Sequence, residues 1–342
     1  MAGELTFAAI GLDHRHIYTM AQNMMDVGCV FKGWWTEGDP QTLPGFIKRF
    51  PDVPRYDDRK ALLEDTGIDF ILIAGVPYER AALAIEAMEH GKDVMTDKPG
   101  CTSLEQLAAL KATSERTNRI WSVNFSERFE VPAVTKVSEL LAEGVIGQVV
   151  QTIGTGPHRL NKATRPDWFF EHEKYGGIIC DIGTHQIDQF LAFTGSTEAE
   201  INFSRVENYA NPETPGLEDF GEVSLSSEHG SGYMRVDWYT PDALPTWGDG
   251  RLFILGTEGT IEMRKYCDLG RNDQTDNIFL VNGTRCEQID GRDAGLPYFR
   301  NLANDIRDRT ETAMSQAHAF KVTELTLTAQ AMANGTKSPE ST

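Results

Sequence analysis

The sequence lacks the features of several protein classes. It has no uninterrupted apolar run of the roughly 20 residues that a membrane-spanning helix needs. The first predicted strand begins near residue 5, so we expect no signal peptide. Basic residues are scarce: 32 Lys and Arg stand against 51 Asp and Glu, for a formal net charge of −19. This balance argues against nucleic acid or an anionic membrane as partner.

Cysteines are few, and none of them is spaced as in a CxxC or a metal-binding motif. There are five: Cys29, Cys101, Cys180, Cys267 and Cys286. Thiols of this kind are typical of a reducing compartment. We therefore predict a cytoplasmic protein.

Short apolar strands alternate with helical segments over the first 120 residues. The strands are predicted at Leu5–Ile10, Val30–Trp35, Phe70–Ala74, Asp93–Thr96 and Ile120–Val123, and the helices at Glu79–His90 and Leu104–Thr117. This alternation is typical of a doubly wound parallel sheet, the α/β Rossmann architecture. Ligands of such sheets bind at the carboxyl ends of the strands. Those ends carry Gly11, Thr36-Glu37, Gly75-Val76-Pro77 and Asp97-Lys98-Pro99.

The loop after the first strand departs from the dinucleotide fingerprint Gly-x-Gly-x-x-Gly. Only Gly11 is present, because Asp13 and His16 occupy the second and third glycine positions. Helix N-terminal amides can still bind phosphate, and Arg15 can add a charge-assisted contact. His14 and His16 also suggest a metal site, but the sequence offers no clear further ligand beyond Asp13. We predict no metal.

Asp181 and His185 form the most informative pair in the chain. If Asp181 opens a helix, the spacing of four places both side chains on one face. A carboxylate beside an imidazole is the arrangement that orients a general base. The alternative from spacing alone is a capping aspartate with a buried, hydrogen-bonded histidine one turn later.

The chain changes character after about Gln148. Alternating segments predict antiparallel strands of an open sheet, with turn signals at residues 228–230, 257–259 and 282–283. Leu302–Asn334 has helical spacing. We predict a dinucleotide-binding domain at 1–123, an α+β substrate and oligomerisation domain at 124–334, and a flexible tail at 335–342.

Several segments, in this order, resemble the glucose–fructose oxidoreductase / inositol dehydrogenase (Gfo/Idh/MocA) family over nearly the whole chain. Residues 91–99 (GKDVMTDKP) resemble the family's AGKHVxxEKP segment, with Asp97 in place of Glu. Residues 123–129 (VNFSERF) resemble GFNRRF, and residues 144–149 (GVIGQV) match G-x-IG-x-V. Trp168 and Tyr175–Asp188 match W…GGG-x-x-x-D-x-G-x-H-x-x-D.

The resemblance implies an NAD(P)-dependent oxidoreductase, a homo-oligomer formed through the free sheet face, and a catalytic group of Lys98, Asp181 and His185. In that group His185 is the general base, Lys98 stabilises the developing alkoxide and Asp181 orients them. The residues expected to bind cofactor are Gly11, Leu12, His14, Arg15, Thr36, Glu37, Gly75, Val76, Pro77, Asp97 and Lys98. Glu37 would repel a 2′-phosphate, which favours NAD slightly over NADP.

The candidate substrate residues are Arg128, Arg159 and Trp168, together with Asp181 and His185; Tyr239 and Trp247 are further pocket candidates. Aromatic rings and arginines suit a sugar, a cyclitol or a related polyol as substrate. Two alternatives stay open: a glycoside-cleaving relative that recycles bound NAD, and a non-catalytic regulatory protein that keeps the fold.

Overall fold

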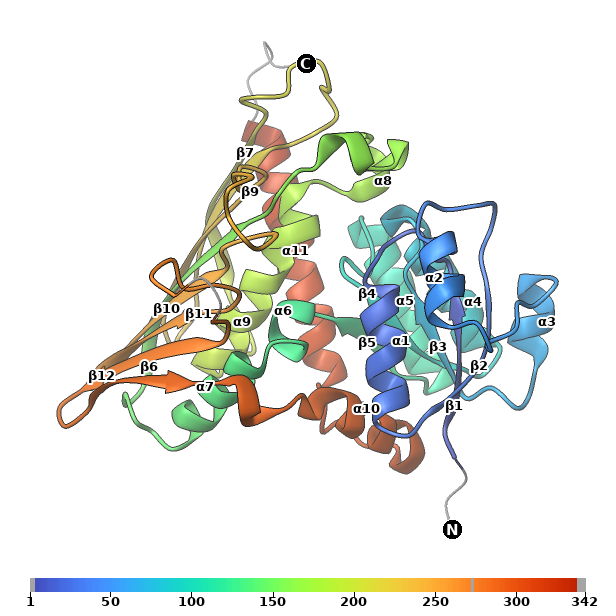
Figure 1. The fold of residues 1–342 in the computed structure, drawn as a ribbon, viewed down its shortest axis with the longest axis horizontal. Coiled ribbons are helices and arrows are strands. Elements are labelled where there is room, and N and C mark those ends of the chain that lie inside the picture. Colours follow the sequence, from blue (N-terminus) through green and yellow to red (C-terminus); the bar gives the residue numbers. More distant parts are fainter. Residues whose placement is uncertain (1–3, 272–273, 337–342) are drawn as a thin grey trace. The chain divides into compact units, whose positions relative to one another are not determined.

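The computed structural model describes residues 4–271 and 274–336, which form two compact units (Figure 1). The first unit extends to Asn124 and takes in Glu173–Gly176 and Pro297–Thr323. The second comprises Phe125–His172, Gly177–Leu296 and the chain from Glu324. The first boundary between the units follows Asn124, next to the predicted domain boundary at 123/124. Each unit is made of separate segments of the chain, whereas the predicted domains are continuous.

The first unit contains a five-stranded parallel sheet in the order β2-β1-β3-β4-β5. Its strands are β1 (Thr6–Ile10), β2 (Val30–Trp35), β3 (Phe70–Ile73), β4 (Asp93–Asp97) and β5 (Trp121–Asn124). The helices that alternate with them are α1 (Ile17–Asp26), α2 (Leu43–Arg49), α3 (Arg59–Glu64), α4 (Pro77–Glu89) and α5 (Leu104–Thr117). The doubly wound parallel sheet predicted from the sequence is confirmed.

Local sequence signals explain where these elements begin and end. Every residue of β3, β4 and β5 is buried, as expected for central strands of a parallel sheet covered on both faces. Helix α4 begins at Pro77, whose fixed φ suits the first turn. Helix α5 begins after Ser103, which accepts the N–H of Gln106, and ends at Asn118 in the left-handed conformation.

The second unit contains an eight-stranded sheet in the order β13-β12-β11-β10-β6-β9-β8-β7. Its strands are β6 (Val149–Pro157), β7 (Glu200–Glu207), β8 (Phe220–Ser226), β9 (Ser231–Asp237), β10 (Arg251–Gly256), β11 (Gly259–Arg264), β12 (Asn277–Asn282) and β13 (Cys286–Asp290). All neighbours pair antiparallel except β6 and β9, which are parallel. This mostly antiparallel second sheet is confirmed, and each of the three turn signals lies between consecutive strands.

Helices cover one face of that sheet. They include α6 (Ser126–Phe129), α7 (Pro132–Ala142) and α9 (Thr184–Thr194), and α9 lies along β6 (Figure 1). A core of aliphatic side chains from α7 and from strands β10 to β12 fills the space beneath, including Val137, Ile254 and Leu280. Short helical segments, Lys162–Thr164, Asp167–Phe170 and α8 (His172–Tyr175), precede α9 in the chain.

The C-terminal helical prediction divides into two helices, α10 (Pro297–Asp308) and α11 (Gln316–Thr336). Gly335 and Thr336 still belong to α11, and the rest of the predicted tail, from residue 337, lies outside the described residues. Along the described chain, no helix combines the length and the apolar character that membrane crossing requires.

Candidate nucleotide site and catalytic residues

A cavity of about 310 Å³ lies at the carboxyl edge of the parallel sheet in the first unit. It is lined by Gly11, Asp13, Trp35, Glu37, Arg59, Gly75, Tyr78, Glu79, Ala82, Leu83 and Gln106. Three of the predicted cofactor residues, Gly11, Glu37 and Gly75, are among them. Since such an edge is where these sheets bind nucleotides, the cavity is the candidate cofactor site.

Two glycines shape the cavity floor. Gly11 has a φ of +72°, in the region that favours glycine, and a Cβ there would lie 2.8 Å from Cα of Gly75. The ends of β1 and β3 therefore approach each other as closely as backbone allows. A backbone cradle of this kind fits a dinucleotide, whose phosphates require close approach of the chain.

The other predicted loop residues hold the loop itself in place. Leu12 and Thr36 are both buried, and the N–H of Leu12 donates to Oγ1 of Thr36 at 3.3 Å. The carbonyl of Leu12 accepts the hydroxyl of Thr42. Thr36 thus contacts the loop instead of facing the cavity, and the carboxylate available to a ribose is that of Glu37, one residue later.

Arg80 of α4 is completely buried and hydrogen-bonds to the backbone of the segment that carries Lys98. Its Nε donates to the carbonyl of Gly75 at 2.8 Å. Its Nη1 donates to the carbonyls of Asp97 and Pro99, at 3.0 Å and 3.1 Å, and to that of Lys98. One guanidinium therefore joins the cavity floor to the backbone of the predicted catalytic lysine. The Lys98–Pro99 peptide bond is cis.

The carboxylate of Asp97 gathers three nitrogen-bearing side chains. Nη2 of Arg80 lies 3.1 Å from Oδ2, Nδ1 of His14 lies 2.7 Å from Oδ2, and Nδ1 of His16 bonds to Oδ1 at 2.8 Å. Burial alone would raise the pKa of Asp97, but His16, Arg80 and His14 hold it well below its usual range. Because an ionised carboxylate only accepts, Nδ1 of His16 carries the proton. The same burial lowers the pKa of His14 to about 4, so His14 is neutral near pH 7.

The sequence offered no further ligand for His14 and His16, and the structure supplies Asp97. Within the described residues, the ligand atoms of these three side chains lie within 4.8 Å of one another. Nδ1 of His16 makes a hydrogen bond to Oδ1, while Nδ1 of His14 and Nη2 of Arg80 lie at ion-pair distance from Oδ2. That the group holds no metal ion stays a prediction.

Val76 and Pro77 begin α4, and Arg15 is exposed at the loop surface. Lys98 is buried, with 4% of its surface exposed, and its positive charge acts on His14. All of the predicted cofactor residues therefore belong to the first unit. Several side chains that line the cavity were not among the predicted cofactor residues, chiefly Asp13, Arg59, Tyr78 and Glu79.

Asp181 and His185 belong to the second unit, and both are buried. Asp181 does not open an α-helix, the condition under which the spacing of four places it on one face with His185. It lies in a π-helical turn, Ile179–Gly183, and α9 starts only at Thr184. A turn of this kind is frequent at functional sites.

Side chains distant in sequence anchor this turn. The N–H groups of Ile178 and Ile179 donate to Glu218 at 2.9 Å and to Gln330 at 3.0 Å. Gly177 has a φ of +93°, and a Cβ there would lie within 2.5 Å of the Gln330 amide. The glycine before the Asp–His segment is therefore required by packing.

A buried ion pair lies near His185. Nζ of Lys265 is 2.5 Å from Oε2 of Glu127, and Nε2 of Gln186 donates to the same oxygen at 3.0 Å. Burial works to raise the pKa of Glu127, but Lys265 first, and then His185 and His158, lower it to about 2. The imidazole of His185 therefore faces a fixed negative charge. No motif or spacing in the sequence indicates that Glu127 and Lys265 form a buried ion pair near His185.

The predicted substrate arginines have structural partners. Arg128 makes a bidentate pair with Asp188 of α9, both bonds 2.7 Å long. Arg159 donates to backbone carbonyls of the loop at 241–244, among them that of Leu244 at 2.6 Å. Both side chains keep a fifth or less of their surface exposed. Their contact with substrate stays a prediction.

The aromatic candidates lie within the second unit. Trp168 is partly buried beside Phe169, at 6.1 Å between ring centroids. Tyr239 donates its hydroxyl to Asp219, and the ring of Trp247 lies 4.4 Å from that of His158, with the two planes tilted by 57°. Trp247 and Tyr239 keep 44% and 41% of their surfaces exposed, which leaves both open to a ligand.

Comparison with known proteins identifies the class. Residues 44–125 match the model described as "Oxidoreductase family, NAD-binding Rossmann fold", and residues 134–262 match "GFO/IDH/MocA C-terminal domain". The chain is 45% identical to a putative oxidoreductase from Erwinia carotovora atroseptica SCRI1043, covering 97% of this chain and 99% of that one with a TM-score of 0.94.

Two characterised relatives are more distant. The chain is 28% identical to scyllo-inositol 2-dehydrogenase (NAD(+)) of Bacillus subtilis strain 168 over 60% of this chain and 58% of that protein. Levoglucosan dehydrogenase in complex with NADH and levoglucosan shares the fold, with 18% identity over 98% of each chain and a TM-score of 0.80. The chain thus spans less than two thirds of the inositol dehydrogenase that it matches.

Residues 44–125 thus belong to an oxidoreductase family with an NAD-binding Rossmann fold. The chain belongs to the Gfo/Idh/MocA family, as its motifs indicated.

Proposed function

We propose that the protein is an NAD(P)-dependent dehydrogenase that transfers hydride between a secondary alcohol of a sugar, cyclitol or related polyol and nicotinamide. The observation that supports this most directly is the guanidinium of Arg80. It binds the carbonyl of Gly75 in the cavity floor and the carbonyl of Lys98, so the nucleotide cavity and the lysine backbone share one anchor.

The roles of the side chains follow from the chemistry of alcohol oxidation. When bound, the nicotinamide supplies the hydride acceptor. His185 takes the hydroxyl proton, because imidazole titrates close to neutral pH. Lys98 stabilises the negative charge that develops on the oxygen. Asp181, four residues before His185, orients the base and the hydroxyl.

NAD is the favoured cofactor. Glu37 lines the cavity and follows β2, where an acidic side chain can bind ribose hydroxyls and repel a 2′-phosphate. The one arginine of the lining, Arg59, is already paired with Glu86 at 3.0 Å. A 2′-phosphate on the ribose would thus lie beside the Glu37 carboxylate, and the arginine of the lining is already neutralised by Glu86.

The relatives support a polyol substrate. The name of one includes scyllo-inositol, and the structure of another holds levoglucosan. The exposed rings of Tyr239 and Trp247 suit the C–H face of such a ring. Four of the five cysteines are buried, as expected of thiols in the reducing, cytoplasmic location that we propose.

The test is titration of the purified protein with NADH and NADPH, followed by energy transfer from its six tryptophans. Saturable binding of NADH, and then turnover with a panel of sugars and cyclitols, is the expected result. Binding of neither cofactor, once bound cofactor has been excluded on denatured protein, would favour the non-catalytic alternative. Cleavage of a glycoside without net NADH formation would favour the recycling alternative.

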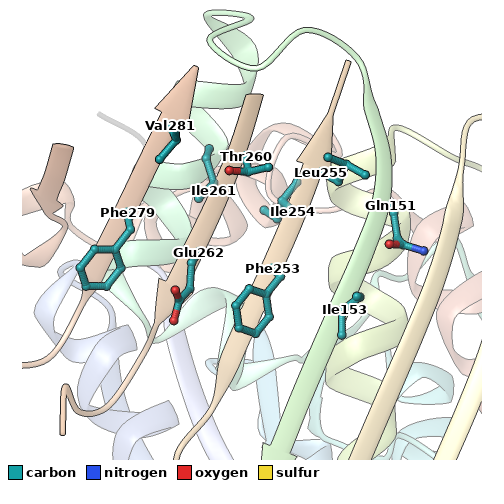
Figure 2. Close-up of a pocket in the computed structure, with 10 residues that line it drawn as sticks. All are labelled: Gln151, Ile153, Phe253, Ile254, Leu255, Thr260, Ile261, Glu262, Phe279 and Val281. Atoms are coloured by element: carbon teal, nitrogen blue, oxygen red, sulfur yellow. The ribbon is translucent and has the colours of Figure 1, made fainter. Parts of the chain in front are cut away.

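We further propose that the open face of the eight-stranded sheet joins copies of this chain. Figure 2 shows Phe253, Leu255 and Val281 standing on this face, and each keeps at least 40% of its surface exposed. Exposed apolar patches of this kind mark contact surfaces. Light scattering should give an oligomer, and Phe253→Glu should dissociate it, whereas Tyr78→Glu in the first unit should not.

A further inference from the structure

Asp13 occupies the part of the nucleotide cavity where a glycine would allow phosphate to approach. Its carboxylate lines the cavity with Gly11 and Gly75. Oδ2 lies 3.7 Å from the position that a Cβ on Gly75 would take. In the dinucleotide fingerprint this is the second glycine, beside which the pyrophosphate passes. An ionised carboxylate at this place would repel the cofactor.

The charged groups around Asp13 do not balance the negative charge that its ionised carboxylate would carry. Glu79 of α4 and Glu37 after β2 face it, so the cavity holds three carboxylates. Arg80 of α4 is the cation acting on it, and Arg80 is committed to Asp97. Two more negative charges from a pyrophosphate would raise the repulsion further.

Of the remaining cations near the loop, Arg15 is exposed at the loop surface, and the others have partners. Arg59 of α3 pairs with Glu86 and lies over the ring of Trp35 at 5.5 Å. In the loop itself, His14 and His16 are directed to Asp97.

We propose that Asp13 is a cofactor-binding residue that acts as a neutral carboxylic acid, so that dinucleotide binding takes up one proton. A protonated carboxyl group donates its O–H to a phosphate oxygen, in place of the backbone approach that a glycine permits. Burial, followed by the charges of Glu79 and Glu37, raises the pKa of Asp13 to about 6 even before a ligand enters. The neutral form is therefore accessible near neutral pH.

This inference rests on the proposed function and predicts a specific pH dependence. Above about pH 6 the ionised form dominates the free protein, so the apparent affinity for NADH should fall by about tenfold per pH unit. Between pH 6 and pH 8.5 the loss should be on the order of a hundredfold.

The experiment is NADH titration of the full chain across this range, with wild type, Asp13→Asn and Glu115→Gln. Asn keeps the size and a donor but does not titrate, so Asp13→Asn should bind NADH at pH 8.5 as tightly as wild type does at pH 6. Glu115→Gln, an exposed change of equal charge on α5, should keep the wild-type slope. Calorimetry of wild type at pH 7.5 with NAD⁺, in two buffers of different ionisation enthalpy, should show uptake of close to one proton.

Three results would overturn the proposal. An NADH affinity of wild type that does not change with pH, or binding without proton uptake, would show that Asp13 does not gain a proton when the cofactor binds. A slope that persists in Asp13→Asn would assign the titration to a group other than Asp13. The proposed function would survive both results. If wild type and Asp13→Asn both failed to bind NADH at every pH, the result would contradict the proposed function and this proposal together.

Discussion

Arg80 and Asp97 form an ion pair at 3.1 Å in which neither side chain has any exposed surface. The pair connects three parts of the first unit: helix α4, the end of β4 with Lys98, and, through His14 and His16, the loop after β1. Such a pair stabilises the native arrangement only while every member is present, because one ion left alone in the interior is costly.

Replacing Arg80 with Met should lower the free energy of unfolding by about 3 kcal/mol or more, since it leaves the carboxylate of Asp97 short of a cation. Denaturant unfolding followed by tryptophan fluorescence measures this. The matched control is Arg116→Met, whose ion pair with Glu89 is exposed. That change should cost less than about 1 kcal/mol. Equal losses in the two variants would contradict the role given to Arg80.

The neutral state of His14 predicts acid lability. The unfolded chain binds a proton at this histidine below about pH 6.5, but the folded pKa is lowered to about 4. Stability from this group is therefore complete above pH 6.5 and is lost as pH falls toward 4. His14→Asn keeps a donor toward Asp97 and should flatten the stability curve in this window by about 1–2 kcal/mol. His229→Asn, at an exposed histidine, should leave the curve unchanged.

The strands of the first unit could be predicted because central parallel strands are continuous apolar runs. Phe70–Ile73 is such a run, and the structure buries all of it. No bounds were predicted for β6, β7, β12 or β13, although the turn signal at residues 282–283 predicted a hairpin between the last two. Strand β13 shows why, because none of its residues is buried and its sequence CEQID has no apolar alternation. Its place in the sheet comes from pairing with β12.

The catalytic candidates were predictable from motifs, but their supporting side chains were not. Arg80 falls in an amphipathic helix where a charge suggests solvent, and nothing local indicates that it is buried. Its partner is 17 residues away, and Lys265 and Glu127 are 138 residues apart. Contacts across such separations depend on the tertiary fold, which periodicity and spacing do not encode.

The Glu127–Lys265 pair should show the non-additivity of a buried ion pair. Lys265→Met should cost about 3 kcal/mol, because Glu127 then keeps its charge without its main partner. The double variant Lys265→Met/Glu127→Leu should be more stable than Lys265→Met alone. Chemical denaturation of wild type, the two single variants and the double variant measures the coupling. A double variant that loses the sum of two independent effects would argue against the pair.

Cofactor preference should depend on Glu37. Glu37→Gln removes the negative charge beside the predicted ribose position and should shift the ratio of NADPH to NADH affinity by about tenfold toward NADPH. Part of the shift should come from weaker NADH binding, since a carboxylate is the better acceptor for two ribose hydroxyls. Paired titrations with both cofactors measure the ratio. Glu115→Gln controls for net charge, and an unchanged ratio in Glu37→Gln would remove Glu37 from cofactor selection.

The proposed chemistry predicts losses of turnover when Lys98 or His185 is replaced. Lys98→Ala should reduce turnover by on the order of a thousandfold, because the developing oxygen charge loses its cation. His185→Ala should reduce it by about 100-fold or more and abolish the gain in rate with rising pH that a histidine base produces. His185 is not part of the cavity lining or of the predicted cofactor residues, so NADH affinity of His185→Ala should stay within about threefold of wild type. Lys98→Ala also tests the predicted contact of Lys98 with the cofactor. Turnover that survives in Lys98→Ala would refute the role of Lys98. A preserved pH profile in His185→Ala would assign the base to another group, while intact NADH binding in the same proteins would show that the Rossmann unit is folded.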